Sequence, residues 1–197
     1  MTPPPRLLLA STSPRRQELL RQLGLNFDVV VPEVHEYRRA GESPLAYVQR
    51  MASDKAHAGK QRAAASGRQG LPVLGADTEV VIDDDVLGKP RDRDAGKALL
   101  RRLAGRTHEV ITAICLLHAD QEHTAVSISR VTFGALTEAE IQDYWERGAA
   151  LDKAGGYGIQ GLAAGFIARL EGSYSGVMGL PLYELAQIMK KTGIPWP

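Results

Sequence analysis

Short apolar runs alternate with helical patterns along the whole chain, and this alternation constrains the fold more than any other feature. The first unit is the apolar run at residues 7–10, the polar segment at residues 11–14, and a helical pattern that stops at Gly24. Pro14 suits the first position of that helix, and glycine suits the position after its end. Because the later strands and helices alternate imperfectly, the sequence predicts an α/β fold with a mixed, twisted sheet flanked by helices and not a regular doubly wound fold.

Hydrophobic periodicity and turn residues predict the remaining elements. Strands are expected over residues 27–31, 73–76, 107–117 and 124–133, and helices over residues 43–65, 92–103, 137–147 and 181–191. The strand that begins at residue 73 is expected to end at Asp77 and Thr78, with residues 80–82 continuing after it and Asp83-Asp-Asp85 turning the chain. This pattern resembles a hairpin that carries an acid at its bend. Thr137 and Glu140 have the spacing of a capping box. The stretch at residues 155–179 is rich in glycine, with only short apolar segments.

Length and charge restrict the class of protein. A chain of 197 residues fits one domain over residues 1–197. Its 24 Lys and Arg against 23 Asp and Glu leave a formal charge of +1, so no global field favours nucleic acid or an anionic membrane. Cys115 is the single cysteine and lies in an apolar run, which excludes an internal disulfide and indicates a buried packing residue. The four apolar residues after the proline-rich start are too few for a signal peptide or a membrane span, so we expect a cytoplasmic protein.

The segment Ser11-Thr-Ser-Pro-Arg-Arg16 lies between a strand end and a helix start. The free N–H groups and the dipole of a helix N-terminus favour an anion there, and Arg15 and Arg16 add forked donors that match phosphate oxygens. A capped helix with two solvated arginines is the alternative that this segment alone leaves open. It is not a Walker A loop, because the G-x-x-x-x-G-K-[ST] pattern does not occur.

Acidic and basic residues supply two further candidate groups. Glu36, in Glu33-Val-His-Glu36, and Asp77 could hold a divalent cation, because hard cations take carboxylate oxygens and phosphoanhydride hydrolysis needs charge neutralisation. Lys55, Lys89 and Lys153 could act as point charges for phosphate, although a solvated lysine is the ordinary interpretation. The histidines lack metal-ligand spacing, and no G-x-S-x-G elbow occurs.

Four groups of segments together resemble the ordered motif set of the Maf family. They are LASTSPRR at residues 9–16, GADT at 75–78 with GKP at 88–90, LDKA at 151–154 with GIQG at 158–161, and GSYS at 172–175 with VMGLP at 177–181. The resemblance spans about residues 7–190. This chain departs from the usual family pattern at His35, at Ala149-Ala150 and at Gly176. These departures leave the geometry of the local loops unpredicted, but they do not affect the predicted reaction.

The resemblance implies a Maf/inosine triphosphatase-like α/β fold with two lobes and a central cleft, usually as a homodimer. It implies hydrolysis of nucleoside triphosphates to monophosphate and pyrophosphate with Mg²⁺ or Mn²⁺. On matching positions, the residues expected along the phosphate path are Ser11, Arg15, Arg16, Lys55 and Lys89. Glu36 and Asp77 would hold the metal, and Asp77 would also be the proton acceptor for the attacking water.

The resemblance further points to a substrate subgroup. Arg15, Thr78 and Gln160 match the subgroup that hydrolyses dTTP and UTP, whereas the subgroup acting on 7-methyl-GTP shows Trp, Gln and Glu at these positions. An amide that both donates and accepts suits the pairing edge of thymine or uracil, and a carboxylate suits the adjacent donors of guanine. One alternative is a regulator of cell division that binds triphosphate without turnover, and the intact acids Glu36 and Asp77 disfavour it. Another is a pyrophosphatase for modified or other nucleotides such as 7-methyl-GTP.

Overall fold

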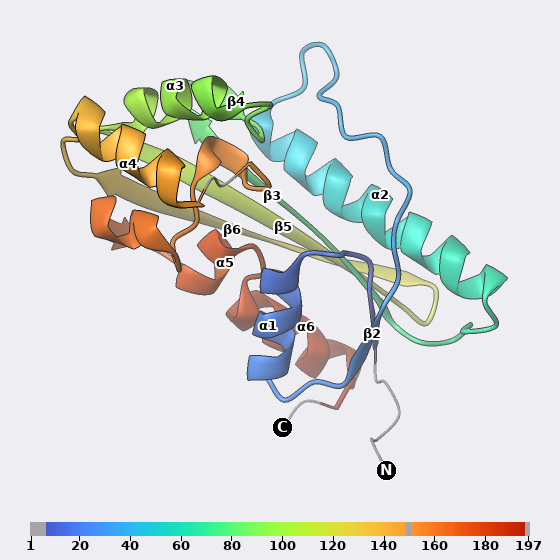
Figure 1. The fold of residues 1–197 in the computed structure, drawn as a ribbon. Helices are drawn as coiled ribbons and strands as arrows, with labels where there is room; N and C mark the ends of the chain where they lie inside the picture. Colours follow the sequence, from blue (N-terminus) through green and yellow to red (C-terminus); the bar gives the residue numbers. More distant parts are fainter. Residues whose placement is uncertain (1–6, 149–150, 196–197) are drawn as a thin grey trace.

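The computed structural model describes residues 7–148 and 151–195, which form one mixed sheet with helices on both faces (Figure 1). The strands are β1 (Leu7–Leu9), β2 (Phe27–Val29), β3 (Val73–Ile82), β4 (Asp85–Leu87), β5 (Thr107–His118), β6 (Gln121–Phe133) and β7 (Ile167–Glu171). The helices are α1 (Pro14–Gln22), α2 (Pro44–Ala65), α3 (Arg93–Leu103), α4 (Glu138–Gly148), α5 (Tyr174–Met178) and α6 (Leu182–Thr192), with two short 3-10 helices, η1 (Ala154–Gly156) and η2 (Leu162–Phe166). The departure noted at Ala149-Ala150 and the proline-rich start lie outside the described residues.

The sheet has the strand order β2-β1-β3-β5-β6-β7, and β4 pairs with the far part of β3. β1 is parallel to both β2 and β3, and the other pairs are antiparallel. The predicted α/β fold with a mixed sheet is therefore confirmed. Parallel pairing of the first strands follows from the crossover helices α1 and α2, because parallel neighbours need a long connection.

The predicted end of a strand at Asp77 is wrong, because β3 runs without interruption from Val73 to Ile82. Asp77 lies in the middle of that strand, and the bend falls at Asp83 and Asp84, whose φ angles are 54° and 62°. Two residues with positive φ fit the tight hairpin that joins β3 to β4. A buried acid usually ends a strand because it needs a polar partner. Here the partner comes from a neighbouring helix.

Most other predicted elements are present with small shifts at their ends. α1 begins at Pro14, and the chain leaves it at Gly24 with a φ of 69°. The capping box of α4 is confirmed, since the Thr137 backbone N–H donates to Glu140 Oε2 at 2.7 Å and the Glu140 N–H donates to Thr137 Oγ1 at 3.2 Å. β7 lies inside the glycine-rich stretch, where the sequence predicted only short apolar segments.

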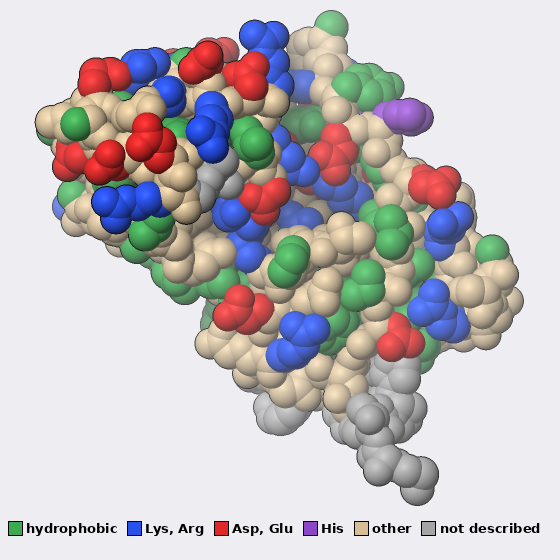
Figure 2. Space-filling model, viewed as in Figure 1, with side chains coloured by type: hydrophobic (Ala, Val, Ile, Leu, Met, Phe, Trp, Pro, Cys, Tyr) green, Lys and Arg blue, Asp and Glu red, His purple; other side chains and the backbone are tan. Residues whose placement is uncertain are grey.

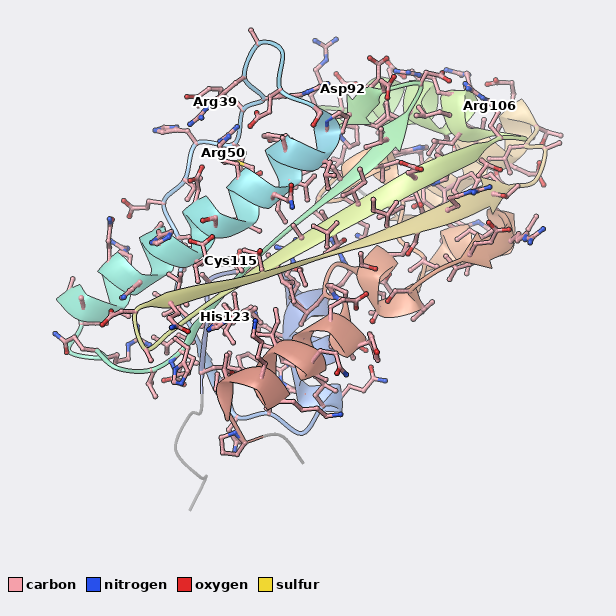
Figure 3. All side chains as sticks on the ribbon, turned by 180° about the vertical axis from the view of Figure 1, so that it is seen from behind. Arg39, Arg50, Asp92, Arg106, Cys115 and His123 are labelled. Atoms are coloured by element: carbon pink, nitrogen blue, oxygen red, sulfur yellow. The ribbon has the colours of Figure 1, made fainter. Side chains whose placement is uncertain are left out.

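The two faces of the sheet carry different layers. α2 covers one face, and its apolar side chains pack on residues that include Val81, Ala113 and Cys115. The predicted burial of Cys115 is confirmed, and Figure 3 shows it beside α2. On the other face, one core joins β3 and β5 to α1 and α6. A second core joins the far ends of the same strands to α3 and α4. Figure 1 shows the helices of these two cores as two groups, α1 with α6 and α3 with α4, and each group with its part of the sheet forms one lobe.

Candidate active site

A cavity of about 560 Å³ opens beside β3, between the two lobes. Its wall includes the loop after β1, the middle of β3, the segment after β4 and the segment that precedes η2. Figure 2 shows Lys, Arg, Asp and Glu side chains gathered in the hollow at the centre of this face. All of the predicted site residues line this cavity: Ser11, Arg15, Arg16, Glu36, Lys55, Asp77, Thr78, Lys89 and Gln160. The structure thus brings them together, and their individual roles remain predictions.

The cavity lies at a gap along one edge of β3. On this edge β3 pairs with β1 at Val73 and Leu74 and with β4 from Val80 onward. The intervening residues 75–79 have no strand partner on that side among the described residues. Side chains alternate between the faces of a strand, so Asp77 and Thr78 point to opposite faces while both border the cavity. The gap gives a ligand access to both faces of one strand.

Lys55 lies between two carboxylates on the α2 face of β3. Its Nζ is 2.6 Å from Asp77 Oδ1 and 2.6 Å from Glu36 Oε1. The Lys89 Nζ lies 4.0 Å from the other oxygen of Glu36. Lys55 and Asp77 are buried, whereas Glu36 and Lys89 lie toward the open side. Lys55 therefore contacts carboxylates in this structure, and its predicted contact with phosphate stays a prediction.

Gly75 brings α2 close enough for this contact. A Cβ atom at Gly75 would lie 2.3 Å from the backbone oxygen of Ala52 and 2.5 Å from the backbone nitrogen of Ala56. Only glycine permits such a close approach of helix to strand. Gly75 therefore lies inside β3, and the approach of α2 accounts for a glycine at this position. Its effect on the site is indirect, because the close packing sets Lys55 against Asp77.

Glu36 and Asp77 differ in how well their surroundings compensate the negative charge of each carboxylate. Partial burial acts to raise the pKa of Glu36, but the charge and hydrogen bond of Lys55, with Lys89, outweigh it and the pKa is lowered. Asp77 is 4% exposed, and its Oδ2 atom is buried with no hydrogen-bond partner among the described residues. An unpaired buried polar atom costs free energy that a ligand can recover.

Glu79 is a cavity residue that the sequence did not identify. It follows Asp77 by two positions, so it shares the α2 face of β3. Burial, and then the charge of Asp77, raise the pKa of Glu79 to about 8. Its Oε2 atom is also buried without a partner. The period-two spacing of the two acids could have revealed it, had the strand been predicted to continue past Asp77.

Arg16 dominates the opposite face of β3. Its Nε donates to the Gly179 carbonyl at 2.8 Å, and its terminal nitrogens donate to Ser11 Oγ and Thr78 Oγ1, both at 3.2 Å. Burial lowers the pKa of Arg16, and the charge of Asp77 acts in the opposite direction. A guanidinium has five N–H groups, so two remain for an anion in the cavity.

The mouth of the cavity is lined by the other predicted residues. Arg15 Nη1 lies 3.1 Å from Asp152 Oδ2, which joins the start of α1 to the segment before η1. Lys153 Nζ is 2.6 Å from the other oxygen of Asp152. Gln160 is exposed on the cavity wall. Its amide is therefore free to meet a base that enters from solvent.

Glu36 and Asp77 fit a divalent cation. Their carboxylate oxygens are the donors that hard cations prefer, and Mg²⁺ commonly takes only one or two carboxylates together with substrate phosphates. The buried, unpartnered Asp77 Oδ2 and the Lys55 ammonium between the two acids both indicate that positive charge is favoured here. Within residues 7–148 and 151–195, no group of three or more His, Cys, Asp or Glu side chains has the arrangement of a metal site. A cation would therefore depend on the substrate for further ligands.

Fold and site define an α/β protein whose cleft, between two lobes, combines paired carboxylates with fixed cationic groups and suits a polyphosphate with its cation. The comparison with known families identifies it further. The chain belongs to the Maf family, since the model described as "Maf-like protein" matches residues 6–192.

Similar proteins extend over nearly the whole chain. A protein of Alkalilimnicola ehrlichii is 49% identical over 98% of this chain and 95% of its own length. Proteins of Saccharophagus degradans and Vibrio cholerae are each 49% identical, over 96% and 94% of this chain and 90% and 97% of their own lengths. All three are named dTTP/UTP pyrophosphatase. In the described part of the chain, no helix has the length and apolar character to cross a membrane.

Proposed function

We propose that this chain is a nucleoside triphosphate pyrophosphatase that hydrolyses dTTP and UTP to the nucleoside monophosphate and pyrophosphate. The observation that carries the proposal is the placement of Asp77 and Arg16 on opposite faces of one strand, with both lining one cavity. A buried carboxylate oxygen without a partner faces the same cavity as a guanidinium with free donors. The names of the relatives, at 49% identity, support the choice of substrate.

Asp77 is positioned to act on water. Its Oδ1 is held by Lys55 at 2.6 Å, which leaves Oδ2 as the free acceptor. A carboxylate fixed in this way can orient a water aimed at the α-phosphorus and accept its proton. Lys55 keeps the carboxylate in place and opposes its charge. The contact of Lys55 with Oδ1 and the unpartnered Oδ2 support this role of Asp77.

Arg16 and Lys89 are placed to stabilise the departing pyrophosphate. Phosphoryl transfer depends mainly on positioning and charge stabilisation, and the two free N–H groups of Arg16 match two phosphate oxygens. Ser11, beside Arg16, adds a hydroxyl at the same wall. We further propose that Glu36 and Asp77 hold Mg²⁺ or Mn²⁺. Such an ion would neutralise negative charge on the phosphate oxygens.

Gln160 supports a pyrimidine substrate. Its amide is exposed on the cavity wall and can both donate and accept, as the pairing edge of thymine or uracil requires. Arg15 borders the same cavity and pairs with Asp152. Thr78 lies on the cavity floor, where its hydroxyl contacts Arg16. We infer that Gln160 reads the base and that Thr78 acts through a phosphate-binding arginine.

A panel of nucleoside triphosphates with product identification tests this function. We expect release of pyrophosphate and monophosphate from dTTP and UTP in the presence of Mg²⁺ or Mn²⁺, and little from GTP or 7-methyl-GTP. A regulator that binds triphosphate without turnover would give saturable dTTP binding and no pyrophosphate. Faster turnover of 7-methyl-GTP would instead overturn the pyrimidine assignment.

The setting of the protein is also part of the proposal. We infer a cytoplasmic homodimer, as the family resemblance implies, and no nucleic-acid partner, because the formal charge of +1 provides no electrostatic attraction. Light scattering coupled to size-exclusion chromatography tests the dimer. A mass of one chain at micromolar concentration would contradict it.

A further inference from the structure

Thr112 is a fully buried polar residue that borders the site without lining the cavity. It lies on β5 directly opposite Thr78 of β3. Its hydroxyl oxygen is 3.0 Å from Thr78 Oγ1 and 2.7 Å from the carbonyl oxygen of Gly176. Thr78 in turn contacts Arg16. A continuous series of hydrogen bonds therefore runs from Arg16 through both threonines to Gly176, in the middle of α5.

The hydroxyl of Thr112 donates toward two acceptors, the Gly176 carbonyl and Thr78 Oγ1. The carbonyl can only accept, and it makes the shorter of the two contacts. Thr78 Oγ1 accepts from Thr112 and also from the N–H of Arg16, which can only donate. Replacing either threonine by an apolar residue would therefore remove a link between Arg16 and Gly176.

These hydrogen bonds connect the guanidinium of Arg16 to both ends of the short segment from Gly176 to Gly179. Arg16 contacts the Gly179 carbonyl directly and reaches Gly176 through the two threonines. Gly179 has a φ of 117°, a conformation that side chains rarely adopt. Because three of the five N–H groups of Arg16 are held, the two free ones keep a constant direction. A fixed donor pair binds an anion at a lower entropic cost.

We propose that Thr112 is a positioning residue for the phosphate-binding half of the site, acting through Thr78 on the orientation of Arg16. This role rests on the proposed function, because the orientation of Arg16 matters for turnover only where it contacts the phosphates. Thr112 itself touches no part of the substrate. A packing role alone would depend on the shape of the side chain and not on its hydroxyl.

Paired substitutions separate the hydroxyl from the shape. Thr112→Val keeps the shape and removes the hydroxyl, whereas Thr112→Ser keeps the hydroxyl and removes the methyl group. We expect Thr112→Val to lower kcat/KM for dTTP and UTP alike by about tenfold, since one hydrogen bond in a buried network is lost. Inhibition by inorganic pyrophosphate should weaken by a similar factor. Thr112→Ser should stay within about twofold of the wild type on the same scale.

Ser127→Ala is the matched control. Ser127 lies opposite Thr112 on β6, is 7% exposed, and would contact a Cβ atom placed on Gly176. It therefore probes a general loosening of the same region without touching the chain of hydrogen bonds. Unchanged kinetics in this variant, beside the loss in Thr112→Val, would support the positioning role. Equal losses in Thr112→Val and Thr112→Ser would overturn it.

A double-mutant cycle with Thr78→Val tests whether Thr112 acts through Thr78. We expect the double variant to lose about as much kcat/KM as Thr78→Val alone. Losses that multiply would show independent action and overturn the proposal. If melting curves show that Thr112→Val does not fold, Thr112→Cys, which keeps a similar size with a weak donor, takes its place. If the wild type hydrolyses no triphosphate, the proposed function fails, and calorimetric binding of inorganic pyrophosphate still compares the variants.

Discussion

The two faces of β3 hold different chemistry within one cavity. On the face under α2, Asp77 and Glu79 lie near the ammonium of Lys55, and each acid has one buried oxygen without a hydrogen-bond partner. On the opposite face, hydrogen bonds hold both Thr78 and the guanidinium of Arg16. The α2 face thus keeps two buried carboxylate oxygens without partners among the described residues, whereas hydrogen bonds already order the side chains of the opposite face.

This difference separates two tasks of the reaction. A buried acid without a partner costs free energy, which a cation or a water can recover on binding. A guanidinium that is already ordered binds an anion with little further loss of entropy. The α2 face therefore suits activation of water at the α-phosphorus, and the opposite face suits the departing pyrophosphate. Each prediction below changes one face and measures the effect on its own task.

Asp77→Asn should have the largest effect. It removes the carboxylate that we propose accepts the proton of the attacking water, while it keeps the shape of the side chain. We expect kcat for dTTP and UTP to fall by about 10³-fold or more. Binding of inorganic pyrophosphate should change little, because the opposite face is intact. Asp85→Asn, at the exposed first position of β4, is the control. Near-normal turnover of Asp77→Asn at saturating Mn²⁺ would remove Asp77 from the reaction.

Arg16→Ala and Lys89→Ala should have the next largest effect. Each removes a positive charge that faces the phosphates and not the base. We expect kcat/KM to fall by about 10²-fold for dTTP and for UTP, in similar proportion. Steady-state kinetics on both nucleotides measure this, with Arg91→Ala, at an exposed position, as the control. A loss confined to one nucleotide would take these residues out of the phosphate site.

Glu79→Gln should change how stability depends on pH in the metal-free protein. In the folded state Glu79 keeps its proton up to about pH 8, whereas the ordinary value is 4.5. The unfolded chain thus releases a proton that the folded chain holds, so stability falls as pH rises from about 5 to 8. The glutamine variant should lack this loss, on the order of 3 kcal/mol.

Urea unfolding in EDTA at pH 6 and pH 9 measures the effect of Glu79. We expect the variant to gain stability relative to the wild type at both pH values, and to gain clearly more at pH 9 than at pH 6. Glu109→Gln, on an exposed position of β5, controls for a general change of charge. An equal difference in unfolding free energy between variant and wild type at both pH values would contradict a raised pKa of Glu79 on the α2 face.

Gln160→Glu should have the smallest effect on rate and the clearest effect on selectivity. The substitution removes a donor that should face a pyrimidine carbonyl and opposes two acceptors. We expect a loss of about 1–3 kcal/mol in transition-state binding of dTTP and UTP. Activity on GTP should fall less, or rise. If dTTP, UTP and GTP activities fell in equal proportion, Gln160 would be a structural residue.

The sequence predicted the residues of the site better than their arrangement. The motif segments identified the residues that line the cavity, from Ser11 to Gln160, although they lie far apart in the chain. The position of Asp77 was wrong, because no local pattern reveals that β1 and β4 leave a gap along β3. Glu79 was missed because the strand was predicted to end before it, although its spacing from Asp77 is a local pattern. Thr112 was missed because its role depends on register between strands, which pairing across the sheet sets and local sequence does not.

The fate of oxygen from water tests the central claim most directly. The α2 face is expected to direct water at the α-phosphorus while the opposite face holds the leaving pyrophosphate. Turnover of dTTP in H₂¹⁸O with Mg²⁺, analysed by mass spectrometry, should place the label in dTMP and leave pyrophosphate unlabelled. Label in pyrophosphate, or release of dTDP and inorganic phosphate, would contradict this division between the two faces of β3.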